Sequence, residues 1–297
     1  MNRTSAAPVS TSSSRAVRFP VRAAWLGLIG QRSILVLIGV WLAEAIGFGV
    51  VLNAALYRSL SADQTVDPAM TEEMGNSLHP HSLDVFAAGA IPFYGAAMAL
   101  AIGALAVGNE YRFGTVRLLY SQGPGRLAVL GAQLVALVGL LGLMSLATYI
   151  ADFAGLSVVS ALWAWPIGAP PLGSTLTSLA ATWLTVTAYG LLGAALAVLT
   201  RGIVWALTGG LIWVVGAETA LTAIAGAVPW LKGPAHGLLG AATSNLAVAR
   251  GAYPWWPGAM STSVTPGEGW AAALVLAVWA IAGTGVALAA IGRRDIG

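Results

Sequence analysis

The stretch 127-LAVLGAQLVALVGLLGLMSLATYIA-151 contains no charged residue over its whole length. An α-helix rises about 1.5 Å per residue, so about 20 apolar residues are needed to cross the bilayer's hydrocarbon core, which is roughly 30 Å thick. Leucine, alanine, valine and glycine make up most of the stretch, and its few polar side chains are uncharged. The stretch is therefore predicted to be a transmembrane helix.

Five further apolar runs of similar length lie near 33–57, 85–107, 174–200, 203–225 and 270–292. The stretch 174–225 must hold two spans, because one helix of that length would be about 78 Å long. Arg201-Gly202 marks the turn between them. The first run is not expected to be a cleaved signal peptide, because it is longer than the roughly 7–15 apolar residues of such a peptide and no small-residue cleavage site follows it. The sequence therefore predicts an all-α integral membrane protein with six transmembrane helices between residues 33 and 292.

The overall composition supports this class and excludes several functions. Of the 297 residues, 58% are hydrophobic and 8% are charged, whereas a soluble domain carries about 25% charged residues. Cysteine is absent, which excludes disulfides, thiolate nucleophiles and Cys-ligated metals. The single lysine, Lys232, lies in no G-x-x-x-x-G-K-[ST] loop, so the chain cannot itself be a P-loop ATPase. No Ser/His/Asp arrangement and no nucleic-acid footprint are present, so neither a catalytic triad nor a nucleic-acid partner is expected.

The basic residues indicate how the spans are oriented. Six spans place both termini on one side, and only Arg58, Lys232 and Arg250 of the 14 basic residues fall on the other. Cytoplasmic loops carry an excess of Lys and Arg, and tryptophans gather at membrane interfaces. Most acidic residues and several tryptophans fall in the loops that this topology places outside. We therefore expect a multi-pass protein of the cell membrane, in contact with lipid, with both termini cytoplasmic.

The segments outside the spans have distinct characters. Residues 1–14 are small and polar, which predicts a disordered tail. The segment 15-RAVRFPVRAAWLGLIGQR-32 mixes arginines with apolar residues, and it is either an interfacial amphipathic helix or a basic flank of the first span. The segment 235-AHGLLGAATSNLAVAR-250 is too short to cross a bilayer, so a re-entrant or interfacial helix is expected before the last span. Residues 293–297 are predicted to be a cytoplasmic C-terminus.

Some polar residues lie in or near the predicted spans. An ionised Glu44 or Glu218 inside a span costs several kcal/mol unless it faces a cavity or a partner. Each therefore either lines a translocation path or forms a hydrogen bond between helices. Asp152 is expected at the outer end of the third span, where it can reach water. His79 and His81 match no metal-ligand spacing, so a solvated loop without a metal is favoured.

Small residues form a ridge on the second predicted span. Gly95, Ala99 and Gly103 recur at every fourth position. Such a pattern permits close packing of two helices, either within a chain or between two chains of a dimer. The ridge by itself does not decide between these two roles.

The segment 108-GNEYRFGTVRLLYSQGPGR-126 interrupts the apolar chain with charges on the predicted cytoplasmic side. Thr115 can cap the N-terminus of a short helix, and Gly123-Pro124-Gly125 ends it. A solvated loop has no need of several apolar residues flanked by arginines. We therefore expect this segment to be a docking surface for a soluble partner, with its apolar contacts supplied by Val116, Leu118, Leu119 and Tyr120.

The same segment resembles the loop between the second and third spans of type-2 ATP-binding-cassette (ABC) exporter permeases. In that family a Glu, a Gly-Thr pair and a following Arg recur at this spacing. The ending 292-GRRDIG-297 is similar to the family's Arg-Arg-Asp ending. With six spans and cytoplasmic termini, the resemblance covers nearly the whole chain from Arg15 onward. One departure is Gln133, because family members often have a Lys early in the third span, so no contact of that charge is carried over.

The resemblance implies a permease subunit that moves a substrate out of the cell. Its partners would be a second permease chain, identical or related, and two cytoplasmic ABC ATPase subunits. The chain would hold no cofactor, because ATP and magnesium bind to the ATPase. The segment near 109–122 would be the coupling helix, whose contacts with the ATPase would be made by Glu110, Arg112, Thr115, Val116, Arg117, Leu118, Leu119 and Tyr120.

Two other classes remain open. In an ion- or proton-coupled secondary transporter, Glu44 or Glu218 would carry the coupling ion, but such proteins usually have more spans or internal repeats. An integral membrane enzyme or assembly factor would show turnover by the purified chain alone. The predicted spans, which would form the walls of a translocation path, are mostly Ala, Leu, Val and aromatic. A hydrophobic or amphiphilic drug, lipid or peptide is therefore the favoured substrate class.

Overall fold

The computed structural model describes residues 13–63, 65–113, 125–252 and 269–293. All the regular secondary structure in these residues is helical, as the long apolar runs predict. The predicted tail (residues 1–14) and C-terminus (residues 293–297) lie almost entirely outside the described residues.

Five helices in the described residues are long and apolar enough to cross a membrane. The first, Arg32–Ala62, joins α2 (Arg32–Glu44), a π-helix η1 (Ala45–Leu52) and α3 (Asn53–Ala62). The fifth predicted span combines α9 (Ile203–Leu211), a second π-helix η3 (Ile212–Ala217) and α10 (Glu218–Ala227). The other three are α7 (Arg126–Leu162), α8 (Leu172–Thr200) and α13 (Gly269–Gly292). An all-α chain with several membrane-length apolar helices is thus confirmed.

The second predicted span, 85–107, lies in α5 (Leu83–Phe113), which is not straight. Its two parts, Pro80–Ala90 and Tyr94–Asn109, are bent by 60°. Counting this bent pair as one span brings the number of membrane-length segments to six. The sequence has Pro92 between the two parts, and proline removes a backbone donor and commonly kinks a helix.

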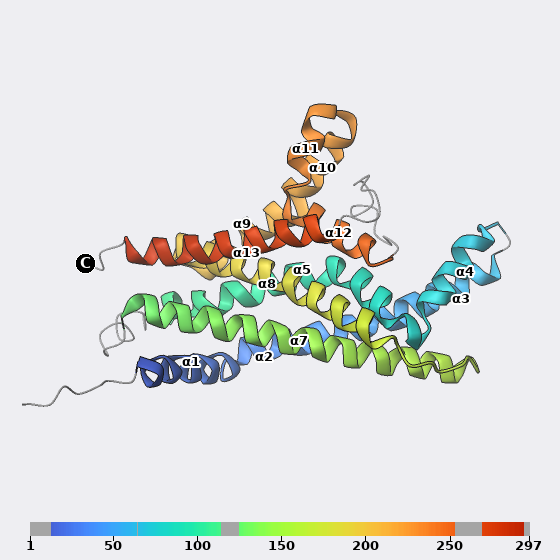
Figure 1. Ribbon diagram of the computed structural model, residues 1–297, viewed down its shortest axis with the longest axis horizontal. Helices are drawn as coiled ribbons and strands as arrows, with labels where there is room; N and C mark the ends of the chain where they lie inside the picture. Colours follow the sequence, from blue (N-terminus) through green and yellow to red (C-terminus); the bar gives the residue numbers. More distant parts are fainter. Residues whose placement is uncertain (1–12, 64, 114–124, 253–268, 294–297) are drawn as a thin grey trace, which may run out of the picture.

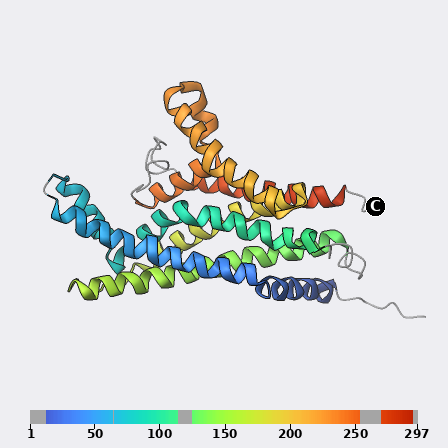
Figure 2. The same ribbon diagram turned by 180° about the vertical axis from the view of Figure 1, so that it is seen from behind.

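The long helices run along one axis of the molecule (Figures 1 and 2). At one end lie α1 (Ser13–Ile29) and the C-terminal end of α13, with α3 and α4 (Pro68–Ser77) at the opposite end. α1 packs against α7, with Leu28 buried and Trp25 beside Gly139. A break at Gly30-Gln31 separates α1 from α2, so the predicted 15–32 helix is a distinct element that ends before Arg32.

The centre of the bundle is the crossing of α5 and α8, which are packed almost backbone to backbone. A Cβ atom on Gly103 would overlap the carbonyl group of Gly190, and one on Gly193 would overlap the carbonyl oxygen of Leu100. Ala99 is fully buried beside them. The ridge of small residues in the second span therefore serves packing within the chain, the first of its two predicted roles.

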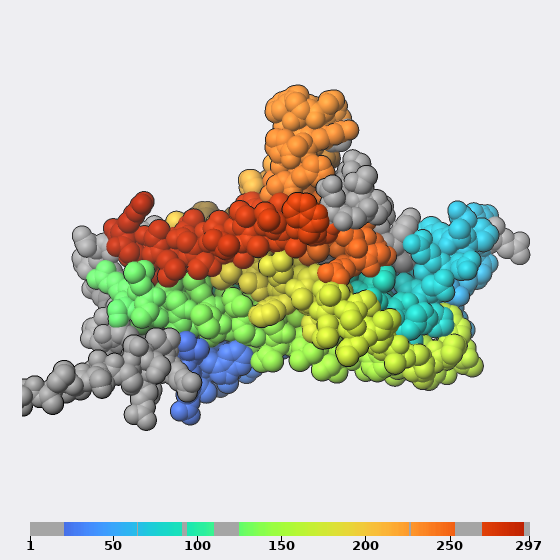
Figure 3. All heavy atoms as spheres, in the orientation of Figure 1, coloured from blue at the N-terminus to red at the C-terminus, as the bar shows by residue number. Residues whose placement is uncertain are grey.

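Two short helices precede the last span. α11 (Lys232–Ala235) follows α10, and together they protrude from the side of the bundle, in orange in Figure 3. α12 (Leu239–Ala249) then returns to the bundle, where it packs against α13, α5 and α8. Most of its side chains are buried. A short apolar helix is thus present where the sequence predicts a segment too short to span.

Candidate functional site

Three acidic or phenolic side chains meet inside the apolar bundle. We call this group the carboxyl cluster: Glu44 at the end of α2, Tyr94 on α5 and Asp152 on α7. Asp152 is 0% exposed and Tyr94 5% exposed, whereas Glu44 is half-buried. The Tyr94 hydroxyl is close enough to interact electrostatically with both carboxyl groups. Three helices that are distant in the sequence therefore bring polar groups to one place.

The cluster is unusual because its polar atoms are unpaired. Both carboxyl oxygens of Asp152, the hydroxyl of Tyr94 and Oε2 of Glu44 are buried without a hydrogen-bond partner among the described residues. About nine in ten buried polar groups have a partner. Removing a carboxylate from water without compensation costs far more than removing a neutral group. The cluster is therefore a place where a positively charged group or a proton would be strongly stabilised.

A hydrogen bond between helices sets the position of the two carboxyls. The indole N–H of Trp41 donates to Oγ1 of Thr148 at 2.7 Å, and the Thr148 hydroxyl donates to the Met144 carbonyl. Side chains three or four residues apart lie on the same face of a helix. Glu44 follows Trp41 by one turn and Asp152 follows Thr148 by one turn, so this bond brings the two carboxyls to the same level.

A π-helical segment begins directly after Glu44. Gly49 of η1 faces the cluster, because a Cβ atom there would lie 3.7 Å from Oδ1 of Asp152 and 3.8 Å from the ring of Phe86. The Asn53 amide donates to the carbonyls of Phe48 and Gly49, at 3.1 and 2.6 Å. π-Helical turns are rare and are often found at functional sites. The widened turn lets the first span approach α7 closely beside Asp152.

The expectation that Asp152 reaches water at the end of the third span is wrong. α7 continues for three more turns beyond the predicted end at residue 151, so Asp152 lies within the helix. The residues that follow, 153-FAGLSVVSAL-162, are again mostly apolar and keep the helix in the bundle. Asp152 therefore does not mark the end of the third span, because the helix runs past it.

Glu218 lies in a second polar site, which is fully paired. Its carboxylate accepts from the backbone N–H groups of Leu239 and Gly240, at 3.1 and 2.6 Å, and from the Trp213 indole at 3.0 Å. The two backbone donors belong to the start of α12, where a negative charge is favoured by the free N–H groups and the helix dipole. These are hydrogen bonds between elements, the second of the two roles that the sequence allows for Glu218.

A glycine lies directly beside this carboxylate. A Cβ atom on Gly240 would lie 2.7 Å from Oε2 of Glu218. The absence of a side chain therefore lets the helix start approach the carboxylate directly. Glu218 also follows η3 immediately, just as Glu44 immediately precedes η1. Both intramembrane glutamates thus adjoin a π-helical segment, which no periodicity in the sequence marks.

The predicted coupling segment is described only at its start. The backbone of Glu110 and Arg112 belongs to the last turn of α5, which ends at Phe113. The other coupling residues lie outside the described residues: Thr115, Val116, Arg117, Leu118, Leu119 and Tyr120.

The end of α5 that leads into this segment is tied to two other elements. The Asn109 amide donates to the side-chain oxygen of Gln31, at the break between α1 and α2. On the same turn, a Cβ atom on Gly108 would lie 2.6 Å from Cγ1 of Ile203, at the start of α9. The end of α5 is therefore in contact with the start of the first span and of the fifth.

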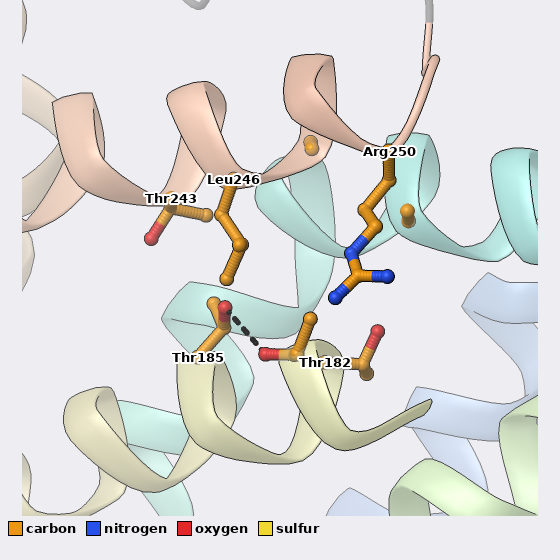
Figure 4. Close-up of a pocket in the computed structure, with 8 residues that line it drawn as sticks. Thr182, Thr185, Thr243, Leu246 and Arg250 are labelled. Atoms are coloured by element: carbon orange, nitrogen blue, oxygen red, sulfur yellow. Dashed lines mark hydrogen bonds between the residues drawn. The ribbon is translucent and has the colours of Figure 1, made fainter. Parts of the chain in front are cut away.

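A small polar cavity lies where α12 meets α5 and α8 (Figure 4). Its volume is about 10 Å³, which suits a single water molecule. Thr182 and Thr185 of α8 face Thr243 of α12, and Arg250 reaches toward α8 from the end of α12. The Thr185 hydroxyl donates to the Ala181 carbonyl at 3.0 Å. The cavity is too small to hold a substrate and serves to seat α12.

The two histidines before α5 differ in exposure, because His79 is half-buried and His81 is exposed. The His79 ring stacks on Trp165 at 4.5 Å between ring centres and on His81 at 5.2 Å. Burial lowers the pKa of His79, and the nearby His81 lowers it further. No group of three or more His, Asp or Glu side chains within the described residues is placed to hold a metal ion. The solvated-loop expectation is thus wrong for His79, while His81 is exposed.

Comparison with known proteins does not identify a family for this chain. No protein-family model matches this sequence, and a comparison with curated proteins yields no match.

Proposed function

We propose that the chain is the permease subunit of an ABC exporter, moving a hydrophobic or amphiphilic substrate out of the cell with energy from a separate ATPase. The observation that carries this proposal is the segment 108–126, where charged and apolar residues interrupt a membrane-length helical bundle. The chain has no nucleotide-binding loop, so in an ATP-driven exporter a partner would bind the ATP. A second permease chain and two ATPase subunits complete the proposed assembly.

The packing around the end of α5 supports a coupling role for this segment. ATP binding can drive a change between two permease states only if the ATPase contacts them with different free energies. The pairs Asn109–Gln31 and Gly108–Ile203 connect the end of α5 to the first and fifth spans. A force applied just beyond Phe113 therefore has direct routes into the bundle.

Charge changes in the coupling segment are expected to weaken the ATPase response. In Glu110→Ala and Arg117→Glu, stimulation of a co-expressed ATPase subunit should fall about tenfold, since the loss of one charge-assisted contact is worth roughly 1.5–3 kcal/mol. Stimulated ATP hydrolysis in proteoliposomes measures the effect. The matched controls, Glu72→Ala and Arg58→Glu, alter exposed residues on the opposite side of the predicted membrane and should behave as wild type. Normal coupling in both segment variants would contradict the docking assignment.

A second candidate function is supported by the carboxyl cluster. An ion- or proton-coupled secondary transporter requires an intramembrane carboxyl that gains and loses a cation, and Glu44 and the unpaired Asp152 both lie near the Tyr94 hydroxyl. Glu218 suits this role less well because its oxygens already accept three hydrogen bonds. Transport by the lone chain in response to a proton gradient, without ATP, would favour this candidate over the exporter.

A further inference from the structure

We infer that the carboxyl cluster binds the protonated amine of an amphiphilic substrate, with Asp152 as the main counter-charge. The inference rests on the proposed export function and names the substrate class. It starts from four buried polar atoms on three helices that have no partner among the described residues: Oδ1 and Oδ2 of Asp152, Oε2 of Glu44 and the Tyr94 hydroxyl. All four can accept hydrogen bonds, so together they fit a group that is both cationic and rich in donors.

An ammonium group has these properties. It offers up to three N–H donors and no acceptor. Hydrogen bonds from a cation to a carboxylate are about twice as strong as neutral ones. Inside an apolar bundle they also offset the desolvation of the buried Asp152 carboxylate. An amine therefore supplies what the cluster lacks, which is positive charge and several donors within a small volume.

Aromatic rings favour an organic cation over a metal ion. The rings of Trp41 and Tyr94 meet edge to face at 6.0 Å, and the Phe86 ring lies near Gly49, as Oδ1 of Asp152 does. Ring faces attract organic cations through their quadrupoles. Hard metal ions instead need about six oxygen ligands. Within the described residues no group of three or more His, Asp or Glu side chains is placed to hold a metal.

The surface next to Glu44 provides a place for the apolar part of such a substrate. Glu44 is only half-buried, and large apolar side chains near it on the first span are exposed: Val40, Ile46, Phe48 and Val51. Asp152 itself is fully buried and η1 passes close to it, because a Cβ atom added at Gly49 would lie 3.7 Å from its Oδ1. The amine therefore reaches Asp152 when the first span moves away from α7, beginning at Glu44.

The test is a binding measurement on the purified full-length chain in detergent, without ATP or ATPase. The probe is dansylcadaverine, a fluorescent hydrophobic primary amine, and its N-acetyl derivative is the matched uncharged ligand. The wild type is expected to bind the amine about tenfold more tightly than the N-acetyl derivative, as one charge-assisted contact implies. Asp152→Asn should remove this preference, and Tyr94→Phe, which keeps the ring, should weaken it about threefold. Asp63→Asn makes the same change at an exposed position and should have no effect.

Each outcome bears directly on the inference. Equal binding of the two ligands by the wild type would overturn it, as would an undiminished preference in Asp152→Asn. If Asp152→Asn does not elute as a folded protein, the comparison of the two ligands and the Tyr94→Phe variant still decide. A chain that prefers the amine but stimulates no ATPase would contradict only the export function, whereas a coupled permease without the preference would contradict only this inference.

Discussion

Replacing Gly103 by alanine is expected to destabilise the bundle more than any other single methyl group added to the described spans. The new Cβ atom would overlap the carbonyl group of Gly190, which is backbone and cannot rotate away. Relief requires α5 and α8 to separate, and their crossing is the most extensive contact between helices in the described residues. Overpacking of a core costs about 1–3 kcal/mol and occasionally more, and we expect the upper end here.

Thermal unfolding in detergent, monitored by size-exclusion chromatography, measures this loss of stability. The matched control is Gly285→Ala on α13, where no heavy atom lies within 4 Å of the added Cβ position. The control should unfold at the wild-type temperature or slightly above it, since alanine favours a helix by up to about 1 kcal/mol over glycine. Equal melting temperatures for the two variants would show that α5 and α8 do not pack this closely.

Replacing Glu218 by alanine is expected to release α12 from the start of the protruding segment. The change leaves the N–H groups of Leu239 and Gly240 and the indole of Trp213 without their acceptor. A buried donor left unsatisfied costs about 1–3 kcal/mol. The loss is therefore a local opening of several kcal/mol, concentrated at one helix start, in a bundle whose α5–α8 core is unaffected.

The absence of cysteine in the chain makes this opening measurable. A single Ser244→Cys substitution places a thiol at a residue that is 8% exposed. The reaction of this thiol with a maleimide should be slow in the otherwise wild-type chain. With Glu218→Ala the reaction should be at least about tenfold faster, because a local opening made easier by more than about 1.4 kcal/mol raises the open population at least tenfold. Glu218→Gln retains one acceptor and should fall between the two. An unchanged labelling rate in Glu218→Ala would contradict the anchoring role.

The extent of the helices was largely predictable from the sequence, because a membrane span is defined by the length of its apolar run. All six predicted runs coincide with helices in the structure. The predictions failed at positions where the packing of the folded chain is not evident from the composition of the sequence. Asp152 was taken as a helix end, although a helix can bury one carboxyl when apolar residues continue on both sides of it. The 60° bend in α5 is not reported by hydropathy, although the sequence has Pro92 between its two parts.

The candidate site was only partly predictable. Glu44 and Glu218 were found because an acidic residue in an apolar run is conspicuous. Their different roles depend on neighbours from distant parts of the chain. Glu218 meets the start of α12, whereas Glu44 and Asp152 both lie near Tyr94. Nothing in the sequence marks Tyr94 as a partner, and the two π-helical segments that adjoin the glutamates leave no periodic signal.

The two polar sites differ in whether their buried oxygens are hydrogen-bonded. The Glu218 site is fully paired and holds α12 against the fifth span. The polar atoms of the carboxyl cluster have no hydrogen-bond partner among the described residues. The cluster lies between α7 and the first span, many of whose apolar side chains are exposed. In the proposed exporter, the first span is therefore the element whose movement admits the substrate. The Asn109–Gln31 contact joins its base to the coupling segment.

In the proposed exporter, the chain draws its energy from a separate ATPase. The most direct measurement is affinity purification of the tagged full-length chain from its native membrane, followed by identification of the accompanying proteins and assay of ATP hydrolysis. We predict that an ABC ATPase subunit co-purifies, that hydrolysis requires it, and that the chain alone has no ATPase activity. Recovery of the chain without any ATPase, together with proton-driven transport by that chain alone, would contradict the account.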